Sequence, residues 1–341
     1  MPSPAVTVVV GTYNQKRFVR ECLDSVRAQT SQDFELIIID DASRDGTADM
    51  IRAWLAETGY HAHFVHNAVN QGLCANFNTS LTLAAGRFVC FLSGDDAFEP
   101  DRIERQLQFI DNQPETVAAV FSDARIVDAD GSELYSSLLS YHLGSEPVPS
   151  GTDLFARLLL KGNFIPMPAT MIRRRAIELV GLVDDSLYYE DYQLWLKLSH
   201  RFQFHYLSGH LAKYRLLPHS MSRNPANRRA MVNSEFRILS AWLGRCGEAN
   251  QELIDRLWGR GYVHLDYRLY TEARAAFAFA AQADGGALRR VAAGLLHMPG
   301  VPHAVTRTRQ CLHLARRVRN RISRGMAARS GARAPNTGAG G

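Results

Sequence analysis

Short apolar runs alternate with amphipathic stretches through the first hundred residues of the chain. The apolar runs, which are typical of buried strands, fall at 6–10, 34–39, 64–65 and 88–92. Between them, residues 18–26, 47–55 and 81–85 have the pattern of helices. Strands that alternate with helices of this length predict βαβ units, and therefore an α/β fold with a mostly parallel sheet flanked by helices.

Polar and acidic residues follow three of these strands. Tyr13-Asn14, Asp40-Asp41 and Asp95-Asp96 each stand where a strand ends. Right-handed crossovers place the carboxyl ends of parallel strands at one edge, so we expect these residues to line one crevice, where open α/β sheets bind ligands. Asp95 or Asp96 alone is equally compatible with a helix cap, but three strand ends together favour a site. An acid pair there is suited to hold a divalent cation against a phosphate.

The pattern continues less regularly after residue 100. It predicts a strand at 117–122, a flexible loop at 136–151, a helix at 152–160, and further strands at 171–173, 204–206 and 212–214. Glu190-Asp191 opens an apolar helix, where acids either cap the helix or take part in chemistry.

The composition is that of an ordinary globular protein, but the charge is unevenly distributed along the chain. It has 341 residues, of which 46% are hydrophobic, and a net charge of +5. Residues 286–341 hold eleven arginines and no Lys, Asp or Glu, so the rest of the chain is at 5 − 11 = −6. The five cysteines are scattered without metal-binding spacing, which indicates reduced thiols. We see no signal peptide and no apolar run of about 20 residues, and we therefore predict a cytoplasmic protein.

An ordered set of motifs resembles the family 2 glycosyltransferases, enzymes with the GT-A fold that use nucleotide sugars. The motifs span residues 5 to about 222. They are Val8–Asn14, Phe34–Thr47, Asn70-Gln71-Gly72, Gly94-Asp95-Asp96, Gly181–Asp184, Glu190–Trp195, and Tyr214-Arg215 followed by His219 and Ser222.

The resemblance implies roles for particular residues. Thr12, Tyr13 and Asn14 would line the donor nucleotide, and Asp41 would accept a hydrogen bond from a ring N–H of its base. Asp96, supported by Asp95, would bind Mn²⁺ or Mg²⁺. The donor would be a nucleoside diphosphate sugar, with UDP the commonest choice in the family.

The resemblance also implies an inverting transfer in which Asp191 deprotonates the acceptor hydroxyl. A metal at the diphosphate and a separate carboxylate free to take a proton fit that chemistry. The acceptor would be a glycan or a lipid-linked glycan, as in cell-surface polysaccharide assembly. His219 is either a further metal or phosphate contact on a lid or a surface residue.

Two positions depart from the family pattern. Many relatives carry Asp where this chain has Ser93, which leaves open whether Ser93 contacts the ribose of the donor. Many also have Ala-Arg-Asn where this chain has Asn76-Phe77-Asn78, so an arginine that would contact the base or phosphate is missing.

The last third of the chain has a different pattern. We predict a catalytic domain at 1–225, with a nucleotide-sugar half (1–98) and an acceptor half (99–225), followed by a helical appendage at 226–285. Residues 253–281 resemble one tetratricopeptide-like helix pair, which is either a packing appendage or a protein-binding module.

The tail at 286–341 is rich in arginine and partly disordered by composition. Within it, residues 300–325 form a basic amphipathic pattern that favours an anionic membrane surface, at the inner face of the cell membrane, over nucleic acid.

Two other functions compete with glycosyl transfer. A sugar nucleotidyltransferase would need a glycine-rich, basic first loop for a triphosphate, and Gly11–Asn14 is neither. A non-catalytic scaffold that uses the helical region would not need the acids at Asp41, Asp95, Asp96 and Asp191.

Overall fold

The computed structural model describes residues 3–151, 154–218, 220–221 and 223–284. It divides into two compact units, residues 1–242 and 243–341, and each is described by itself. His219, Ser222 and the tail at 286–341 lie outside the described residues.

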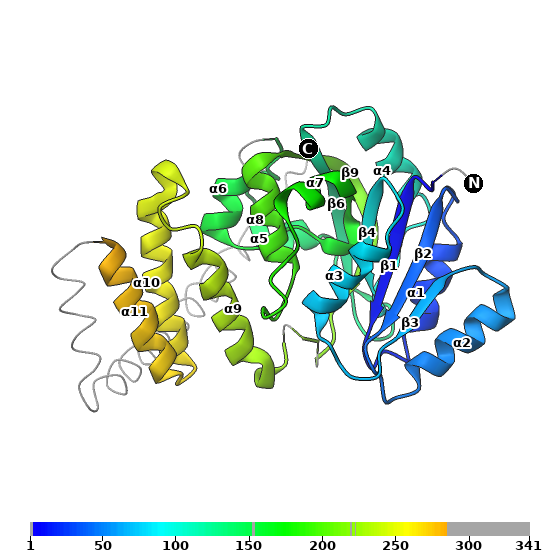
Figure 1. The fold of residues 1–341 in the computed structure, drawn as a ribbon, viewed down its shortest axis with the longest axis horizontal. Helices are drawn as coiled ribbons and strands as arrows, with labels where there is room; N and C mark the ends of the chain where they lie inside the picture. Colours follow the sequence, from blue (N-terminus) through cyan, green and yellow to red (C-terminus); the bar gives the residue numbers. More distant parts are fainter. Residues whose placement is uncertain (1–2, 152–153, 219, 222, 285–341) are drawn as a thin grey trace, which may run out of the picture. The chain divides into compact units, whose positions relative to one another are not determined.

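The first unit is built on a nine-stranded mixed sheet (Figure 1). Its strands are β1 (Val6–Thr12), β2 (Phe34–Asp40), β3 (His63–His66), β4 (Phe88–Ser93), β5 (Ala97–Phe98), β6 (Val117–Val127), β7 (Glu133–Tyr135), β8 (Thr170–Arg173) and β9 (Gln203–Arg215). The order is β3-β2-β1-β4-β8-β6-β9-β5, with β7 beside β6. The α/β prediction is confirmed. The first four strands are parallel, whereas β8 runs antiparallel to both β4 and β6.

Helices cover both faces of this sheet. They are α1 (Val19–Arg27), α2 (Thr47–Thr58), α3 (Leu73–Leu83), α4 (Arg102–Asp111), α5 (Leu138–Leu143), α6 (Leu154–Lys161), α7 (Arg174–Val180), α8 (Asp191–Arg201) and α9 (Arg228–Ser240), with short 3₁₀ turns at Met167–Ala169 and Pro225–Asn227. No helix in the part of the chain that the structure describes is long and apolar enough to cross a membrane.

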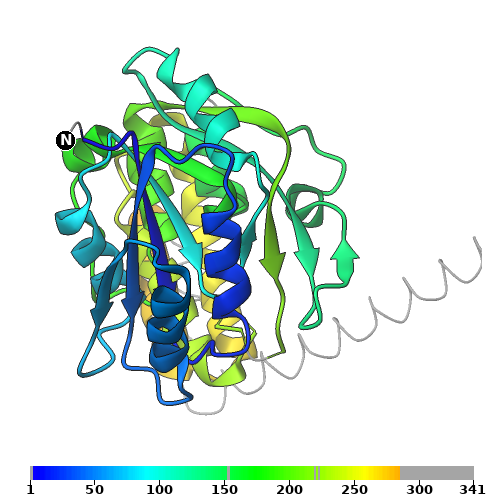
Figure 2. The ribbon, with the colours of Figure 1, turned by 90° about the vertical axis from the view of Figure 1, so that its right-hand side faces the viewer.

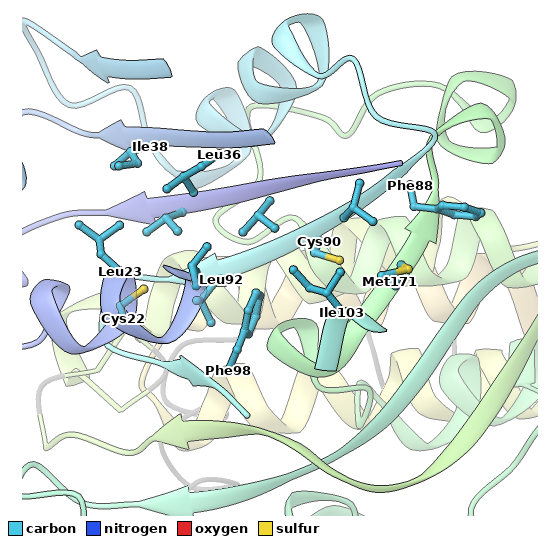
Figure 3. Close-up of a cluster of buried hydrophobic side chains, with 14 of the residues drawn as sticks. Cys22, Leu23, Leu36, Ile38, Phe88, Cys90, Leu92, Phe98, Ile103 and Met171 are labelled. Atoms are coloured by element: carbon cyan, nitrogen blue, oxygen red, sulfur yellow. The ribbon is translucent and has the colours of Figure 1, made fainter. Parts of the chain in front are cut away.

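The main hydrophobic core lies under α1, α2 and α4, where one set of alternating strand side chains meets the apolar stripes of these helices (Figures 2 and 3). Cys90 and Leu92 of β4 point into this core with Leu23 of α1 and Ile103 of α4. The alternate residue Phe91 points to the other face and stacks on Phe77 of α3, at a centroid distance of 4.3 Å. The sheet is therefore buried on both faces here, as its continuous apolar runs predicted.

Two predictions about the acceptor half were wrong. Part of the segment 136–151, which we expected to be a flexible loop, forms helix α5. Ser137 caps this helix by accepting a hydrogen bond from Ser140 N (2.8 Å), and Asp123 of β6 accepts from Leu139 N (3.0 Å). The long-range contact with Asp123 stabilises a helix that local composition does not predict.

The two predicted strands at 204–206 and 212–214 are one strand, β9. Gly209, at φ +115°, lies where the pairing of β9 with β6 shifts register, and an arginine of α4 packs against it. Gly209, which lies between the two predicted strands, therefore marks an irregularity inside one continuous strand.

Helix α9 belongs to the first unit, although the sequence pattern grouped it with the helical appendage. Ser234 Oγ accepts a hydrogen bond from Tyr188 N (2.9 Å), and Arg237 Nη2 lies 2.8 Å from Asp184 Oδ2. These contacts attach α9 to the segment that precedes α8.

The second unit contains a 3₁₀ turn (Gly247–Ala249) and helices α10 (Asn250–Asp266) and α11 (Tyr270–Asp284). The two helices pack through a small core that includes Leu265, Ala273 and Phe277. Gly261 lies against the Phe277 ring so closely that a Cβ there would be 2.7 Å from it. The chain turns between the helices at Arg268, which has φ +60°. The predicted helix pair and its break are therefore present.

Candidate functional site

The ends of β1, β2 and β4 meet at one edge of the sheet. Thr12 pairs with Asp40 in register, and Gly11 pairs with Ser93. Past the strands, Asp41 N donates to Thr12 O (2.9 Å) and Gly94 N donates to Gly11 O (2.9 Å). The structure therefore brings together the strand-end residues that the sequence pattern predicted to be neighbours.

Tyr13 and Asn14 form the loop that follows β1. The Tyr13 ring is 48% exposed, although its neighbour Thr12 is buried. Asn14 has a left-handed backbone (φ +53°) and is held from both sides: its N–H donates to Ser43 Oγ and its Oδ1 accepts from Arg44 N, both at 2.8 Å. A fixed loop thus presents an aromatic face at the sheet edge.

The Asp41 carboxylate binds the loop before α3. It accepts hydrogen bonds from Gln71 N (2.7 Å), Gly72 N (3.0 Å) and Asn67 Nδ2 (2.9 Å). Burial acts to raise the pKa of Asp41, but these donors and Asn76 outweigh it, and the pKa lies below its usual value. Asp41 is therefore ionised, and it joins the end of β2 to the start of α3.

Asp40, which the sequence pattern placed at this edge without a particular role, is the most enclosed acid there. Its side chain is fully buried and accepts from Thr12 Oγ1 (3.0 Å) and Ser43 N (3.1 Å), while His66 Nδ1 lies 2.8 Å away. His66 is the last residue of β3. The expectation that polar residues at the carboxyl ends of parallel strands line one edge therefore also applied to His66. The pair Asp40–His66 joins the ends of three adjacent strands.

The acid pair after β4 is largely buried. Ser93 Oγ donates to Asp95 Oδ1 (2.5 Å), and Asp96 Oδ1 accepts from Arg215 N (2.8 Å). The Arg215 side chain also donates through Nε to Asp95 O (2.8 Å). Burial raises the pKa of Asp95, and burial together with the charge of Asp95 raises the pKa of Asp96 well above its usual value. Two adjacent carboxylates with raised pKa values favour a compensating positive charge.

Gly94 allows a close approach at this point. A Cβ on Gly94 would lie 2.7 Å from Gln15 Oε1 and 2.9 Å from Thr12 Cγ2. Gln15 also donates from Nε2 to Ser93 Oγ (3.0 Å), while its buried Oε1 has no hydrogen-bond partner among the described residues. Gln15 is a second residue that the sequence pattern missed, because it follows a loop rather than a strand.

Asp191 begins α8. Its Oδ2 accepts from Asn163 Nδ2 (2.6 Å) and its Oδ1 accepts from Tyr192 N (2.6 Å). Burial raises the pKa of Asp191 to about 6. The adjacent Glu190 is 7% exposed, and its Oε2 has no hydrogen-bond partner among the described residues. Burial and the charge of Asp191 raise the pKa of Glu190 to about 8.

Helix α3 connects this second acidic group with the sheet edge. Asp41 holds Gly72, which immediately precedes α3, and Cys74 lies in the first turn of that helix. Burial raises the pKa of the Cys74 thiol to about 12, and the charges of Glu190 and Asp191 add to the effect. The two acids on α8 are thus near the amino end of α3, beside the predicted donor residues.

No group of three or more His, Cys, Asp or Glu side chains in the described ranges is arranged to hold a metal ion. Asp95 and Asp96 supply two oxygen ligands of the kind that Mg²⁺ and Mn²⁺ prefer. Cys22, Cys74, Cys90 and Cys246 are free thiols.

Comparison with known proteins identifies the class that this fold and site define. The model of glycosyl transferase family 2 matches residues 7–181, which is half of the chain, and the chain belongs to this family of glycosyltransferases. It is 28% identical over 222 residues to a putative teichuronic acid biosynthesis glycosyltransferase, TuaG, of Bacillus subtilis. That alignment covers 65% of this chain and 82% of TuaG.

Two solved structures share the fold. The crystal structure of S. aureus TarS 1–349 has a TM-score of 0.53 and 17% identity, and the match covers 84% of this chain and 88% of that one. The mannosyltransferase PcManGT of Pyrobaculum calidifontis, in complex with GDP-Man and Mn²⁺, has a TM-score of 0.55 and 19% identity over 92% of this chain and 81% of that one. The GT-A-like fold is confirmed.

Proposed function

We propose that the protein transfers a sugar, with inversion at the anomeric carbon, from a nucleoside diphosphate sugar to a hydroxyl group of a glycan or lipid-linked glycan. One observation carries the proposal: the residues at the ends of β1, β2 and β4 meet at one edge, and a separate half-buried carboxylate, Asp191 of α8, lies near the amino end of α3, which Asp41 joins to that edge. Inverting transfer needs both a polyanion-binding group and a base that is not occupied by it.

The donor nucleotide lies on the loops after β1 and β2. Tyr13 offers an exposed ring for stacking on the base, and Thr12 and Asn14 shape the loop that carries it. Asp41 receives three hydrogen bonds from the loop before α3 and accepts a base N–H at its remaining lone-pair position. UDP is the expected nucleotide; TarS has been crystallised with UDP and with UDP-GlcNAc, and PcManGT with GDP-Man.

Asp96 and Asp95 would hold a divalent metal, Mn²⁺ or Mg²⁺. Burial raises the pKa of both carboxyl groups, and the charge of Asp95 adds to the effect at Asp96; a cation would relieve this. A bound metal would supply the positive charge that stabilises a departing diphosphate. Ser93, which donates to Asp95, orients that carboxylate. His219 remains a predicted contact.

Asp191 accepts the proton of the acceptor hydroxyl. With a pKa of about 6 it is ionised at neutral pH yet more basic than an ordinary aspartate. Asn163 fixes one of its oxygens. Glu190, with a pKa of about 8, keeps its proton at neutral pH, so a second negative charge does not repel the diphosphate.

The name of TuaG supports a role in cell-surface polysaccharide assembly. A cytoplasmic location at the inner face of the membrane, with residues 300–325 on anionic lipid, stays a prediction from the sequence pattern. Co-sedimentation of the full chain and of a chain ending at residue 299 with anionic vesicles tests this part. Equal partitioning of the two forms would contradict it.

Thermal unfolding with UDP, GDP or dTDP, each with and without Mn²⁺, tests the donor site. We expect at least one nucleotide to raise the unfolding temperature, and to do so more with Mn²⁺. We expect Asp96→Asn to abolish the additional rise in unfolding temperature that Mn²⁺ causes, and Asp191→Asn to leave this rise unchanged. If none of the three nucleotides stabilises the protein in a metal-dependent way, the proposed donor site is wrong.

A further inference from the structure

Two tyrosines outside the proposed site form an exposed aromatic pair. Tyr135 is on β7 and Tyr141 on α5, and their ring centroids are 5.0 Å apart with a tilt of 57°. The two residues are 49% and 47% exposed. Aromatic rings that gather on a surface, rather than standing singly, mark binding sites.

The elements that carry this pair are firmly held. The Asp123 carboxylate, 7% exposed, accepts hydrogen bonds from Ser137 Oγ (2.5 Å) and Leu139 N (3.0 Å) at the start of α5. Leu138 packs into a small core with Ile126. Tyr141 therefore projects from an anchored helix, and its ring loses little freedom when a ligand binds.

The pair lies close to the proposed metal-binding acids. Tyr135 pairs with Ile126 of β6, and Ile126 pairs with Tyr214 of β9. Neighbouring strands are about 4.8 Å apart, so the backbones of Tyr135 and Tyr214 are roughly 10 Å apart. The residue after Tyr214 is Arg215, whose N–H donates to Asp96. The aromatic pair thus stands two strands away from the acids at the same edge.

The core under α5 reaches the strand that leads to these acids. Tyr214 packs on this core, which contains Ile126 of β6 and Leu138 of α5, the helix that carries Tyr141. Both elements of the aromatic pair are therefore held against the part of β9 that ends at Arg215.

We propose that Tyr135 and Tyr141 form a platform that binds sugar rings of the acceptor glycan. This rests on the proposed function and names where the acceptor chain lies. One face of a pyranose carries C–H groups that pack on an aromatic ring, while its hydroxyls need polar partners around the ring. The tyrosine hydroxyls and the exposed Ser136 and Ser140 supply these.

The local charge supports a glycan rather than an anionic membrane. The charged residue of β7 is Glu133, which lies 3.6 Å from Arg125 in an ion pair. An anionic lipid surface would favour a basic rim around the tyrosines. Neutral hydroxyl groups around two rings suit a polyhydroxylated ligand.

The test uses the full chain on an array of oligosaccharides of glucose, galactose, mannose, N-acetylglucosamine and glucuronic acid, followed by calorimetric titration with the best binder. The variants are the double substitution Tyr135→Ala/Tyr141→Ala and the conservative pair Tyr135→Phe/Tyr141→Phe. Tyr267→Ala, at a tyrosine that is 40% exposed in the second unit, is the matched control. Unfolding temperature with UDP and Mn²⁺ is measured on every variant.

We expect the double alanine variant to lose oligosaccharide affinity about tenfold, as the removal of two stacking rings implies. The phenylalanine pair should keep most of the oligosaccharide affinity, and the control variant should keep all of it. The rise in unfolding temperature with UDP and Mn²⁺ should be the same in every variant. The platform is refuted if the wild-type chain binds no oligosaccharide, if the alanine variant binds as tightly as the wild type, or if the tyrosines instead mediate binding to anionic vesicles or to a protein. A missing nucleotide response in the wild type would refute the proposed function instead.

Discussion

Replacing Asp191 by Asn should remove activity and stabilise the protein at the same time. In the folded chain burial raises the pKa of this carboxyl from 3.8 to about 6. The folded state therefore holds the proton more tightly than the unfolded chain. The protonated Asp191 makes its full contribution to the free energy of unfolding below pH 4. This contribution is lost as the pH rises towards 6, and it is absent at higher pH.

The size of the effect follows from the shift. A change of about two pKa units corresponds to about 3 kcal/mol as an upper limit, because part of the side chain reaches solvent. An asparagine carries no charge, so it avoids this cost. Its amide presents only one acceptor to the donors Asn163 and Tyr192, but the pKa shift already includes these two hydrogen bonds, which lower the pKa. We expect a gain of up to about 3 kcal/mol at pH 8 and none at pH 4.

Urea unfolding at pH 4, 6 and 8 measures this difference, and release of nucleoside diphosphate from the donor measures turnover. Loss of a general base lowers the turnover about 10²- to 10⁴-fold. Asp185→Asn, at an exposed acid in the segment before α8, removes the same charge and should change both quantities little. Retained turnover in Asp191→Asn, or a stability difference that does not grow with pH, would refute the reasoning.

Three further results are expected. Turnover of the wild type should fall as the pH drops through about 6, where Asp191 takes up a proton, while nucleotide binding followed by calorimetry persists. Asp40→Asn should weaken UDP binding by about 1–3 kcal/mol, because a buried carboxylate that holds Thr12 and Ser43 loses acceptors; an unchanged dissociation constant would count against this role. Gly94→Ala should cost about 1–3 kcal/mol of stability in urea, since its Cβ meets Thr12 at 2.9 Å, whereas Gly11→Ala, with open space around the Cβ, should not.

The donor edge could be predicted well from the sequence. The apolar runs of β1, β2 and β4 are buried on both faces and short, so their type and direction follow from pattern and from the handedness of crossovers. Residues placed directly after such strands have little freedom in position. The ends of β1, β2 and β4, with Thr12, Asp41 and Gly94 bonded across them, therefore came together as expected.

The contacts made by these residues could not be predicted in the same way. The Asp41 carboxylate is largely engaged by backbone N–H groups of the loop before α3, which have no signature in sequence. The sequence pattern does not distinguish Asp40 from Asp41, but strand alternation turns Asp40 inward to His66. Asn163, 28 residues before Asp191, fixes that carboxylate only because the chain folds back.

By itself the sequence determined the α/β class, the edge of the sheet that carries the donor residues, and the acids available for chemistry, because strand periodicity and crossover handedness are local rules. The tertiary structure alone decided which of those acids are buried and how they are paired. It turned a serine-rich segment into helix α5 through the distant Asp123, and it set Tyr135 beside Tyr141. Burial and long-range hydrogen bonds depend on which distant segments are in contact, and the spacing of residues along the chain does not predict those contacts.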